Sequence, residues 1–274
     1  MSGSWERRYI EAGGYRTAYV EAGTGEPLLL LHSVDPGCSG TLEYRHNIAP
    51  LAQEFRVIAP DLVGFGETAP PRPPVASASA MYADHILALM DALGLQRAHI
   101  AGNSRGGLIG IAIAEQHPGR VGRLILLGNA GGGPSLEYME KQAKLYANFR
   151  PEPDQLRFFL SGSFHSLERD VPPPVFAEYL ANAKKQYAAY DKIGGVPTDV
   201  PDLRAALARL KLPILYMFGR EDQRWPPLAQ AVEIYETTPN ARFYVLSQCG
   251  HHPQTEYAAD FNLIAPRFLK GELR

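Results

Sequence analysis

Short apolar runs alternate with helical patterns in the first half of the chain and again near its end. The runs that predict buried strands fall at residues 28–31, 57–59, 98–101, 124–127, 212–218 and 241–246. Apolar residues with helical spacing fall at 81–93, 108–115, 227–237 and 257–269. An earlier strand at 15–21 is expected to be antiparallel and to lie near an edge. This alternation predicts an α/β fold, with a mostly parallel sheet flanked by helices on both faces.

The middle of the chain, from residue 131 to about residue 210, contains no strand-like apolar run. Helical patterns fill it at 136–149, 153–160, 175–190 and 203–210, and its many aromatic residues argue against disorder. We therefore expect a helical cap at 134–210, inserted between two parts of the core at 1–133 and 211–274. Such a lid excludes water and shapes the choice of substrate.

Composition narrows the class of protein. The chain has 274 residues, enough for one large core with an inserted lid. Its net charge of -2 argues against nucleic acid or an anionic membrane surface as the main partner. No apolar run is long enough to span a bilayer, and the first residues lack the apolar core of a signal peptide. Two cysteines, Cys38 and Cys249, are too few for a disulfide framework, which favours a reducing cytoplasm.

The sequence also narrows the expected ligands. It contains no Cys/His cluster with zinc spacing and no phosphate-binding loop, so we infer neither a metal nor a cofactor. The expected partner is a small-molecule substrate. The sequence leaves open a homodimer or a larger homo-oligomer.

The most specific local pattern is Gly-x-Ser-x-Gly, formed by Gly102, Ser104 and Gly106. An apolar strand precedes it and a helical pattern follows it, which is the context of a nucleophile elbow. Because the turn is sharp, the two glycines omit side chains that would clash, and the serine adopts a strained backbone with its hydroxyl exposed. The helix N-terminus then directs backbone N–H groups at the place where an oxyanion forms. Ser104 is therefore the candidate nucleophile.

An acid and a histidine follow later in the chain, each on a loop after a predicted strand. The acid is Asp222, with Glu221 as a rival, and the histidine is His251, with His252 as a rival. In a parallel sheet such loops meet at the carboxyl ends of the strands. Taken singly, the acid is typical of a helix cap and the histidine of an ordinary loop. Together and in this order they predict a catalytic triad with Ser104.

With these motifs the chain resembles the α/β-hydrolase family over nearly its whole length. Residues 28–32 resemble the strand that leads into the family's oxyanion loop, 57–68 its Pro-Asp-x-x-Gly-x-Gly loop, and 117–121 its helix-to-strand connection. Gly-Asn-Ser-x-Gly-Gly at the elbow, Pro36-Gly37 and Ser-x-Cys-Gly-His at the histidine are most similar to the meta-cleavage product hydrolases. Those enzymes cleave a carbon–carbon bond in vinylogous 1,5-diketones formed by aromatic ring fission.

The resemblance implies a role for each candidate residue. His251, which completes the Gly-His signature, would take the proton of Ser104, and Asp222, the fourth residue of Gly-x-x-Asp, would orient the imidazole. The oxyanion hole would use the backbone N–H of Arg105, the residue after the nucleophile. By resemblance, its second donor would be the backbone N–H of Val34.

The chain departs from the family's pattern around the expected pocket. Ser33 and Asp35 stand where the oxyanion loop usually has glycine, and Glu43 stands where the meta-cleavage hydrolases have asparagine. His252 stands where many have tryptophan. The candidate pocket residues are Ser33, Asp35, Glu43, Asn103, Trp225 and His252.

Arg105 also departs from the pattern, because methionine is common at its position. The cap arginine that those enzymes use for the substrate carboxylate has no counterpart that we can place. Three hypotheses for the Arg105 side chain follow: it pairs with Asp35 or Glu43, it replaces that arginine as a carboxylate anchor, or it points along the helix into solvent.

The sequence thus predicts a serine-type hydrolase of a small organic molecule, acting on a carbon–carbon bond in a ring-cleavage product. The alternative is an ester or lactone hydrolase with the same triad. A non-catalytic binder on this scaffold, or a cofactor-free lyase or oxygenase, would not need the hydroxyl of Ser104.

Overall fold

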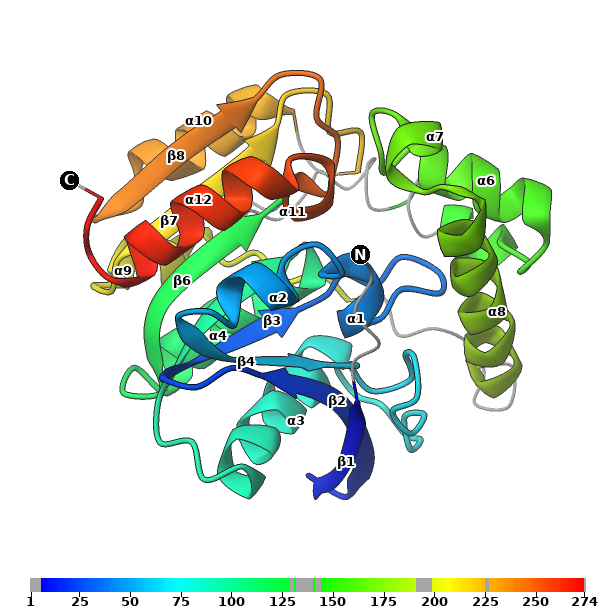
Figure 1. Ribbon diagram of the computed structural model, residues 1–274, viewed down its shortest axis with the longest axis horizontal. Helices are drawn as coiled ribbons and strands as arrows, with labels where there is room; N and C mark the ends of the chain where they lie inside the picture. The colour runs from blue at the N-terminus through cyan, green and yellow to red at the C-terminus, as the bar shows by residue number, and fades with distance from the viewer. Residues whose placement is uncertain are drawn as a thin grey trace.

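An eight-stranded sheet forms the centre of the computed structural model, which describes residues 6–128, 131, 140, 144–190, 199–224 and 227–273 (Figure 1). The strand order is β1-β2-β4-β3-β5-β6-β7-β8. Strand β2 pairs antiparallel with β1 and with β4, and every pair from β4 to β8 is parallel. The strands are β1 (Arg7–Ala12), β2 (Tyr15–Ala22), β3 (Glu26–Leu31), β4 (Phe55–Pro60), β5 (Ala98–Asn103), β6 (Val121–Leu127), β7 (Ile214–Gly219) and β8 (Ala241–Leu246).

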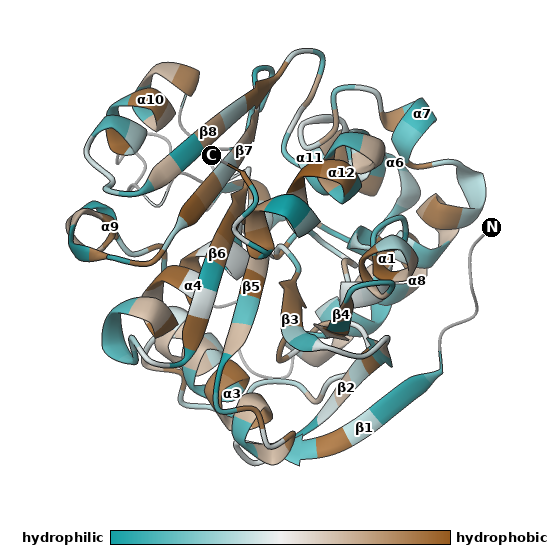
Figure 2. Cartoon of the chain, turned by 60° about the vertical axis from the view of Figure 1, so that its left-hand side comes forward, coloured by the Kyte–Doolittle hydropathy of each residue, from teal (hydrophilic) through white to brown (hydrophobic). Residues whose placement is uncertain are grey.

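Helices cover both faces of the sheet. On one face α3 (Ala78–Ala92), α4 (Arg105–Gln116), α9 (Arg204–Arg209) and α10 (Leu228–Glu236) contribute to one buried apolar cluster. On the other face α2 (Ile48–Leu51) and α12 (Ala258–Leu269) contribute to a second. Strands β3, β6 and β7 are largely hydrophobic, since both of their faces are covered (Figure 2). The predicted α/β fold, with a mostly parallel sheet flanked by helices on both faces, is confirmed.

Three helices lie to one side of the sheet, beyond the ends to which the arrows of β6 and β7 point (Figure 1). They are α6 (Pro153–Ser161), α7 (Leu167–Asp170) and α8 (Pro173–Tyr190). Helices α6, α8 and α9 occupy the predicted helical segments 153–160, 175–190 and 203–210. Half of the predicted helix at 136–149, and the expected cap boundary at 134, lie outside the described residues. The cap boundaries therefore stay a prediction.

Two details differ from the sequence pattern. Strand β1 was not predicted, because its charged residues Arg7, Arg8 and Glu11 leave no alternation of apolar and polar residues. The proline run at 172–174 marks the beginning of a helix, since α8 begins at Pro173, where the missing N–H of proline costs nothing. No helix among the described residues is long and apolar enough to cross a membrane.

Short helices α1 (Gly40–Glu43) and α11 (Pro253–Glu256) complete the described elements. Helix α1 follows the loop after β3, and α11 follows the loop after β8. Both loops are thereby held near the carboxyl ends of the central strands, where parallel sheets place their sites.

Candidate active site

The turn from β5 into α4 has the geometry of a nucleophile elbow. Ser104 has φ 51° and ψ -114°, a left-handed backbone that non-glycine residues rarely adopt. A Cβ on Gly102 would lie 2.3 Å from the backbone of Gly106, and a Cβ on Gly106 would lie 2.2 Å from the carbonyl oxygen of Leu31. Both glycines are therefore required by the turn. The strained residue is also held by its N–H, which donates to the carbonyl of Leu127 at 2.9 Å.

His251 and Asp222 form a buried pair on the loops after β8 and β7. The Nδ1 of His251 lies 2.8 Å from the Oδ2 of Asp222, and the two side chains are 2% and 0% exposed. Asp222 Oδ1 accepts a further hydrogen bond from the N–H of Arg224 at 2.7 Å. The rival acid, Glu221, instead accepts from the N–H of Cys249. Of the two acids and two histidines considered, the structure pairs Asp222 with His251.

Asn103 joins the elbow to the loop after β8, which we call the histidine loop (residues 247–252). Its Nδ2 donates to the carbonyl oxygens of Leu127 at 3.0 Å and of His251 at 2.8 Å. The residue before Ser104 is therefore bonded directly to the backbone of His251, which places both at the same carboxyl edge of the sheet. The Oδ1 of Asn103 is buried without a hydrogen-bond partner in the described part of the chain.

The loop after β3, which we call the oxyanion loop (residues 32–37), is fixed by the carboxylate of Glu43. Ser33 donates its N–H to Glu43 at 2.9 Å and its O–H to the other oxygen. The oxygen of that hydroxyl accepts the N–H of Asp35 at 3.2 Å. Glu43 is fully buried, and burial raises its pKa. As the first residue of α4, Arg105 has a backbone N–H without an acceptor inside the helix, and the loop carries the second candidate donor, Val34.

His252 and Asp35 form a second buried pair. The Nε2 of His252 lies 3.1 Å from the Oδ2 of Asp35, with the side chains 0% and 5% exposed. The imidazole of His252 also stacks on the ring of Phe164, with centroids 4.4 Å apart and planes 16° apart. Two consecutive histidines thus each meet a carboxylate from a different loop.

The side chain of Arg105 follows neither the hypothesis that it points into solvent nor the hypothesis that it pairs with Asp35 or Glu43. It is 5% exposed, so it does not point into solvent. Its Nη1 donates to the hydroxyl of Ser79 at 2.7 Å and to the carbonyl of Asp199 at 2.5 Å, and not to Asp35 or Glu43. The carboxylate of Asp199 in turn accepts the N–H of Ala78 at 2.6 Å, at the beginning of α3. Arg105 therefore ties the chain that returns from α8 to the core.

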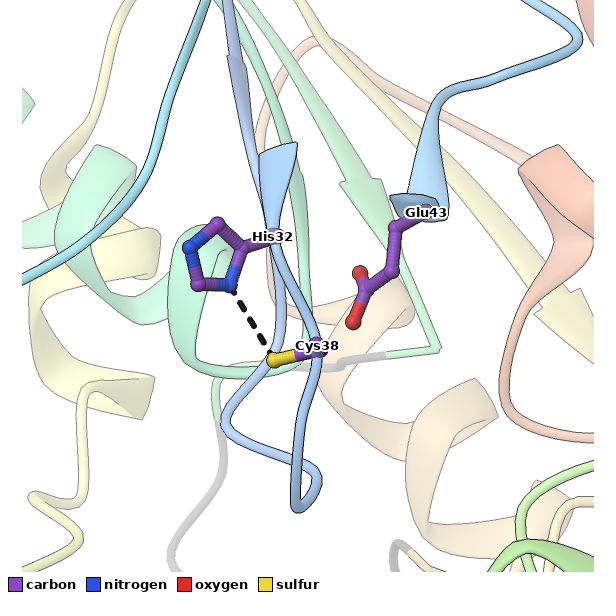
Figure 3. Close-up of side chains that lie close together, drawn as sticks. All are labelled: His32, Cys38 and Glu43. Atoms are coloured by element: carbon purple, nitrogen blue, oxygen red, sulfur yellow. Dashed lines mark hydrogen bonds between the residues drawn. The ribbon is translucent and has the colours of Figure 1, made fainter. Parts of the chain in front are cut away.

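One cluster has the composition of a metal site but not its free ligand atoms. His32, Cys38 and Glu43 face one another around the oxyanion loop (Figure 3). The N–H of Leu62 donates to Nε2 of His32 at 2.8 Å, so the ring hydrogen lies on Nδ1 and donates to the carbonyl of Ser33 at 2.6 Å. Burial lowers the pKa of His32 to about 4, which keeps the ring neutral. Hydrogen bonds therefore account for this cluster without a metal ion.

A cavity of about 580 Å³ lies between α6 and the loop after β7. Its walls include Phe149, Phe158 and Arg224, but neither Ser104 nor His251. It is therefore beside the candidate catalytic residues and not at them. Trp225, a candidate pocket residue from the sequence, lies outside the described residues.

Two residues that the sequence analysis did not single out also hold the site. The Oε1 of Gln186, on α8, accepts the N–H of Gly37 at 2.9 Å, which joins that helix to the oxyanion loop. Glu256 accepts the N–H groups of Gly250 at 3.0 Å and of His252 at 3.1 Å, which fixes the histidine loop. Neither residue belongs to a recognisable motif, since their partners are set by the tertiary fold.

Comparison with known proteins places this geometry in context. Residues 26–257 match the family described as the alpha/beta hydrolase fold. The chain is 33% identical to the 2-hydroxymuconate semialdehyde hydrolase of Pseudomonas putida, over 96% of this chain and 93% of that protein. It is 32% identical to the 2-hydroxy-6-oxo-6-phenylhexa-2,4-dienoate hydrolase of Comamonas testosteroni, over 92% and 90%.

Solved structures give the same picture. The meta-cleavage product hydrolase of Pseudomonas fluorescens IP01 is 29% identical, with a TM-score of 0.82 over 96% of this chain and 97% of that one. The enol-lactonase of Burkholderia xenovorans LB400 is 26% identical, with a TM-score of 0.81 over 96% and 100%. The similarity in each case extends over nearly the whole chain.

Proposed function

The chain belongs to the α/β-hydrolase family and is a hydrolase, and on this premise we propose that it hydrolyses a carbon–carbon bond in a vinylogous diketone formed by ring cleavage. The observation that carries the proposal is the strained Ser104 together with the buried pair of His251 and Asp222, joined by the bond from Asn103 to the backbone of His251. The names of the relatives, which include hydrolases of hydroxy-oxo-dienoates, support the substrate class.

In the proposed reaction His251 takes the proton of Ser104 as the serine oxygen attacks the carbonyl carbon of the substrate. Asp222 holds the imidazole in the required tautomer and stabilises the imidazolium. The backbone N–H groups of Val34 and Arg105 hold the oxyanion. The carbon–carbon bond then breaks, its electron pair passes into the conjugated fragment, and that fragment receives the proton from His251. Water, activated by His251, releases the acyl group from Ser104.

We further propose that residues 134–210 form a lid over this edge of the sheet. The position of α6, α7 and α8 beyond the carboxyl ends of the strands supports this, as does the bond between Gln186 and Gly37. The buried, free Cys38 and Cys249 are in keeping with a reducing cytoplasm.

An ester or lactone hydrolase with the same residues is the second candidate. The observation in its favour concerns the cations near the site. Arg105 donates to Ser79 and Asp199, and Arg224 donates to Ser163 and Phe159, so both guanidinium groups are already bonded to groups of the protein. A substrate without a carboxylate would need neither of them.

One experiment tests the proposal. The purified protein is given a 2-hydroxy-6-oxo-dienoate, whose cleavage is followed as loss of visible absorbance, and in parallel an aryl ester. We expect turnover of both, and loss of both in Ser104→Ala by at least about a thousandfold, because only the nucleophilic oxygen is removed. Ser247→Ala, at an exposed serine after β8, is the matched control and should retain full activity. Ester turnover without dienoate turnover would support the second candidate, and full activity of Ser104→Ala would refute both.

A further inference from the structure

The oxyanion loop is bonded through side chains where the resembling enzymes usually have glycine. Ser33 is bonded to Glu43 on α1, and Asp35 accepts the bond from Nε2 of His252. On the far side, the hydroxyl of Thr255 donates to the carbonyl of Glu43 at 2.9 Å. A closed set of hydrogen bonds therefore joins this loop to the loop after β8.

The hydrogen bond between Asp35 and His252, which we call the link, joins two residues that are each adjacent to a proposed catalytic group. Asp35 directly follows Val34, whose N–H is the proposed second oxyanion donor, and His252 directly follows His251. The N–H of Val34 lies in the peptide plane that Val34 shares with Ser33, and Asp35 follows one residue later. Because Ser33 is bonded to Glu43 and Asp35 to His252, both neighbours of Val34 are held, which limits where its N–H can point. The stacking of His252 on Phe164 fixes the other end of the link.

The surroundings of the hydrogen bond between His252 and Asp35 favour the charged form of both side chains. Burial disfavours the charged form of His252, but the hydrogen bond to Asp35 and the charges of Glu43, Asp35 and Glu256 raise its pKa above the ordinary value. Burial also disfavours the Asp35 carboxylate, yet the hydrogen bond and charge of His252, with a contribution from Arg224, hold its pKa well below the usual range. Charge-assisted bonds of this kind are shorter and stronger than neutral ones.

We propose that Asp35 and His252 are positioning residues: their buried pair holds the oxyanion loop against the histidine loop and so sets the N–H of Val34 relative to His251. This assignment rests on the proposed function. It predicts that the pair contributes to stabilising the tetrahedral intermediate while contributing little to binding of the planar substrate, because only the intermediate places an oxyanion between the two donors.

The test uses three variants and two probes. His252→Phe keeps an aromatic ring against Phe164 but loses the bond, Asp35→Ala removes the carboxylate, and Asp35→Asn preserves its shape and an oxygen that can accept from His252. The probes are an aryl acetate, for kcat and KM, and a boronic acid, which forms a tetrahedral adduct with an activated serine. His85→Phe is the matched control. His85, on α3, is also a buried histidine, and its hydrogen bond is to Thr17, on β2, away from both loops.

We expect kcat to fall about ten- to a hundredfold in His252→Phe and Asp35→Ala, less than the loss of a whole oxyanion donor, with KM changed less than about threefold. Boronic acid affinity should fall by the same factor as kcat. Asp35→Asn should recover part of the loss but keep a kcat below that of the original protein, because it retains an oxygen that can accept from His252 but loses the charge. The double variant Asp35→Ala/His252→Phe should be no worse than either single one, because both break the same link. His85→Phe should keep the kcat and boronic acid affinity of the original protein.

Three results would overturn the assignment. They are an unchanged kcat in both single variants, a fall in kcat without a fall in boronic acid affinity, and a rise in KM alone, which would mean contact with the substrate. If a single variant does not fold, Asp35→Asn measured against His85→Phe still decides, because it retains the packing and loses the charge. In that case a kcat equal to that of the control would overturn the role of the ion pair. An original protein inert toward both probes would instead refute the proposed function, which separates the two failures.

Discussion

Helix α3 contains a buried histidine whose titration should be visible in the pH dependence of stability. His85 is 1% exposed, and its Nε2 lies 2.8 Å from the hydroxyl oxygen of Thr17. That hydroxyl donates to the carbonyl of Tyr15, so it accepts from His85, and the ring hydrogen lies on Nε2. The Nδ1 is buried without a hydrogen-bond partner in the described part of the chain. Protonation would place an unpaired N–H and a charge there.

The magnitude follows from the pKa. Burial lowers the pKa of His85 from its ordinary value of 6.5 to about 4. Below pH 6.5 the unfolded chain therefore takes up a proton that the folded chain does not, and stability is lost as the pH falls. Linkage gives a loss of about 2 kcal/mol between pH 7 and pH 5, and about 3 kcal/mol near pH 4, where the folded protein begins to bind the proton as well.

The assay is urea unfolding of the original protein and of His85→Gln at a series of pH values from 7 to 5. Burial also lowers the pKa of His32, His46 and His99, so the original protein contains several such contributions. Only the difference between the two proteins isolates His85. We expect His85→Gln, which keeps a donor for Thr17, to lose about 2 kcal/mol less than the original protein over this range. Parallel curves for the two proteins would refute the buried, neutral state of His85.

Two further predictions concern packing around the site. Arg105→Met should lower the free energy of unfolding by about 2–3 kcal/mol, because the bonds to Ser79 and Asp199 are lost, and should change KM equally for carboxylated and neutral substrates. A selective rise in KM for the carboxylated substrate would support the hypothesis that Arg105 binds the substrate carboxylate. Gly37→Ala places a Cβ 2.0 Å from the carbonyl oxygen of Tyr179, at a φ of +80°, so α8 must move away; we expect about 2–4 kcal/mol of destabilisation by urea unfolding, with a lower kcat. An unchanged free energy of unfolding and an unchanged kcat would mean that α8 does not pack tightly against the oxyanion loop.

Local sterics explain what could be predicted from the sequence. Gly102, Ser104 and Gly106 encode the elbow within five residues, because the turn itself has no room for side chains. The order of strands and helices was equally readable, since apolar periodicity is a local property. The positions after successive strands pointed to two acids and two histidines, and the resemblance to the family's motifs singled out Asp222 and His251.

The contacts of the residues that depart from the family's pattern could not be predicted from the sequence in the same way. Asp35 and His252 are 217 residues apart in the chain, and Arg105 meets a backbone carbonyl 94 residues away. Any carbonyl can accept a hydrogen bond, so no residue type signals the partner of Arg105. The pairing of Gly37 with Gln186 likewise depends on where α8 packs, and that is set by the whole of its apolar surface.

The two cysteines stand next to the two loops on which the proposed chemistry depends. Cys38 directly follows the oxyanion loop, Cys249 lies two residues before His251, and both are fully buried. Burial raises the pKa of each thiol, so neither reacts with an alkylating reagent until its loop opens. Each cysteine can therefore report the opening of the loop beside it. With the other cysteine replaced, the rate of alkylation would measure how often the oxyanion loop and the histidine loop leave the folded state, independently of any substrate.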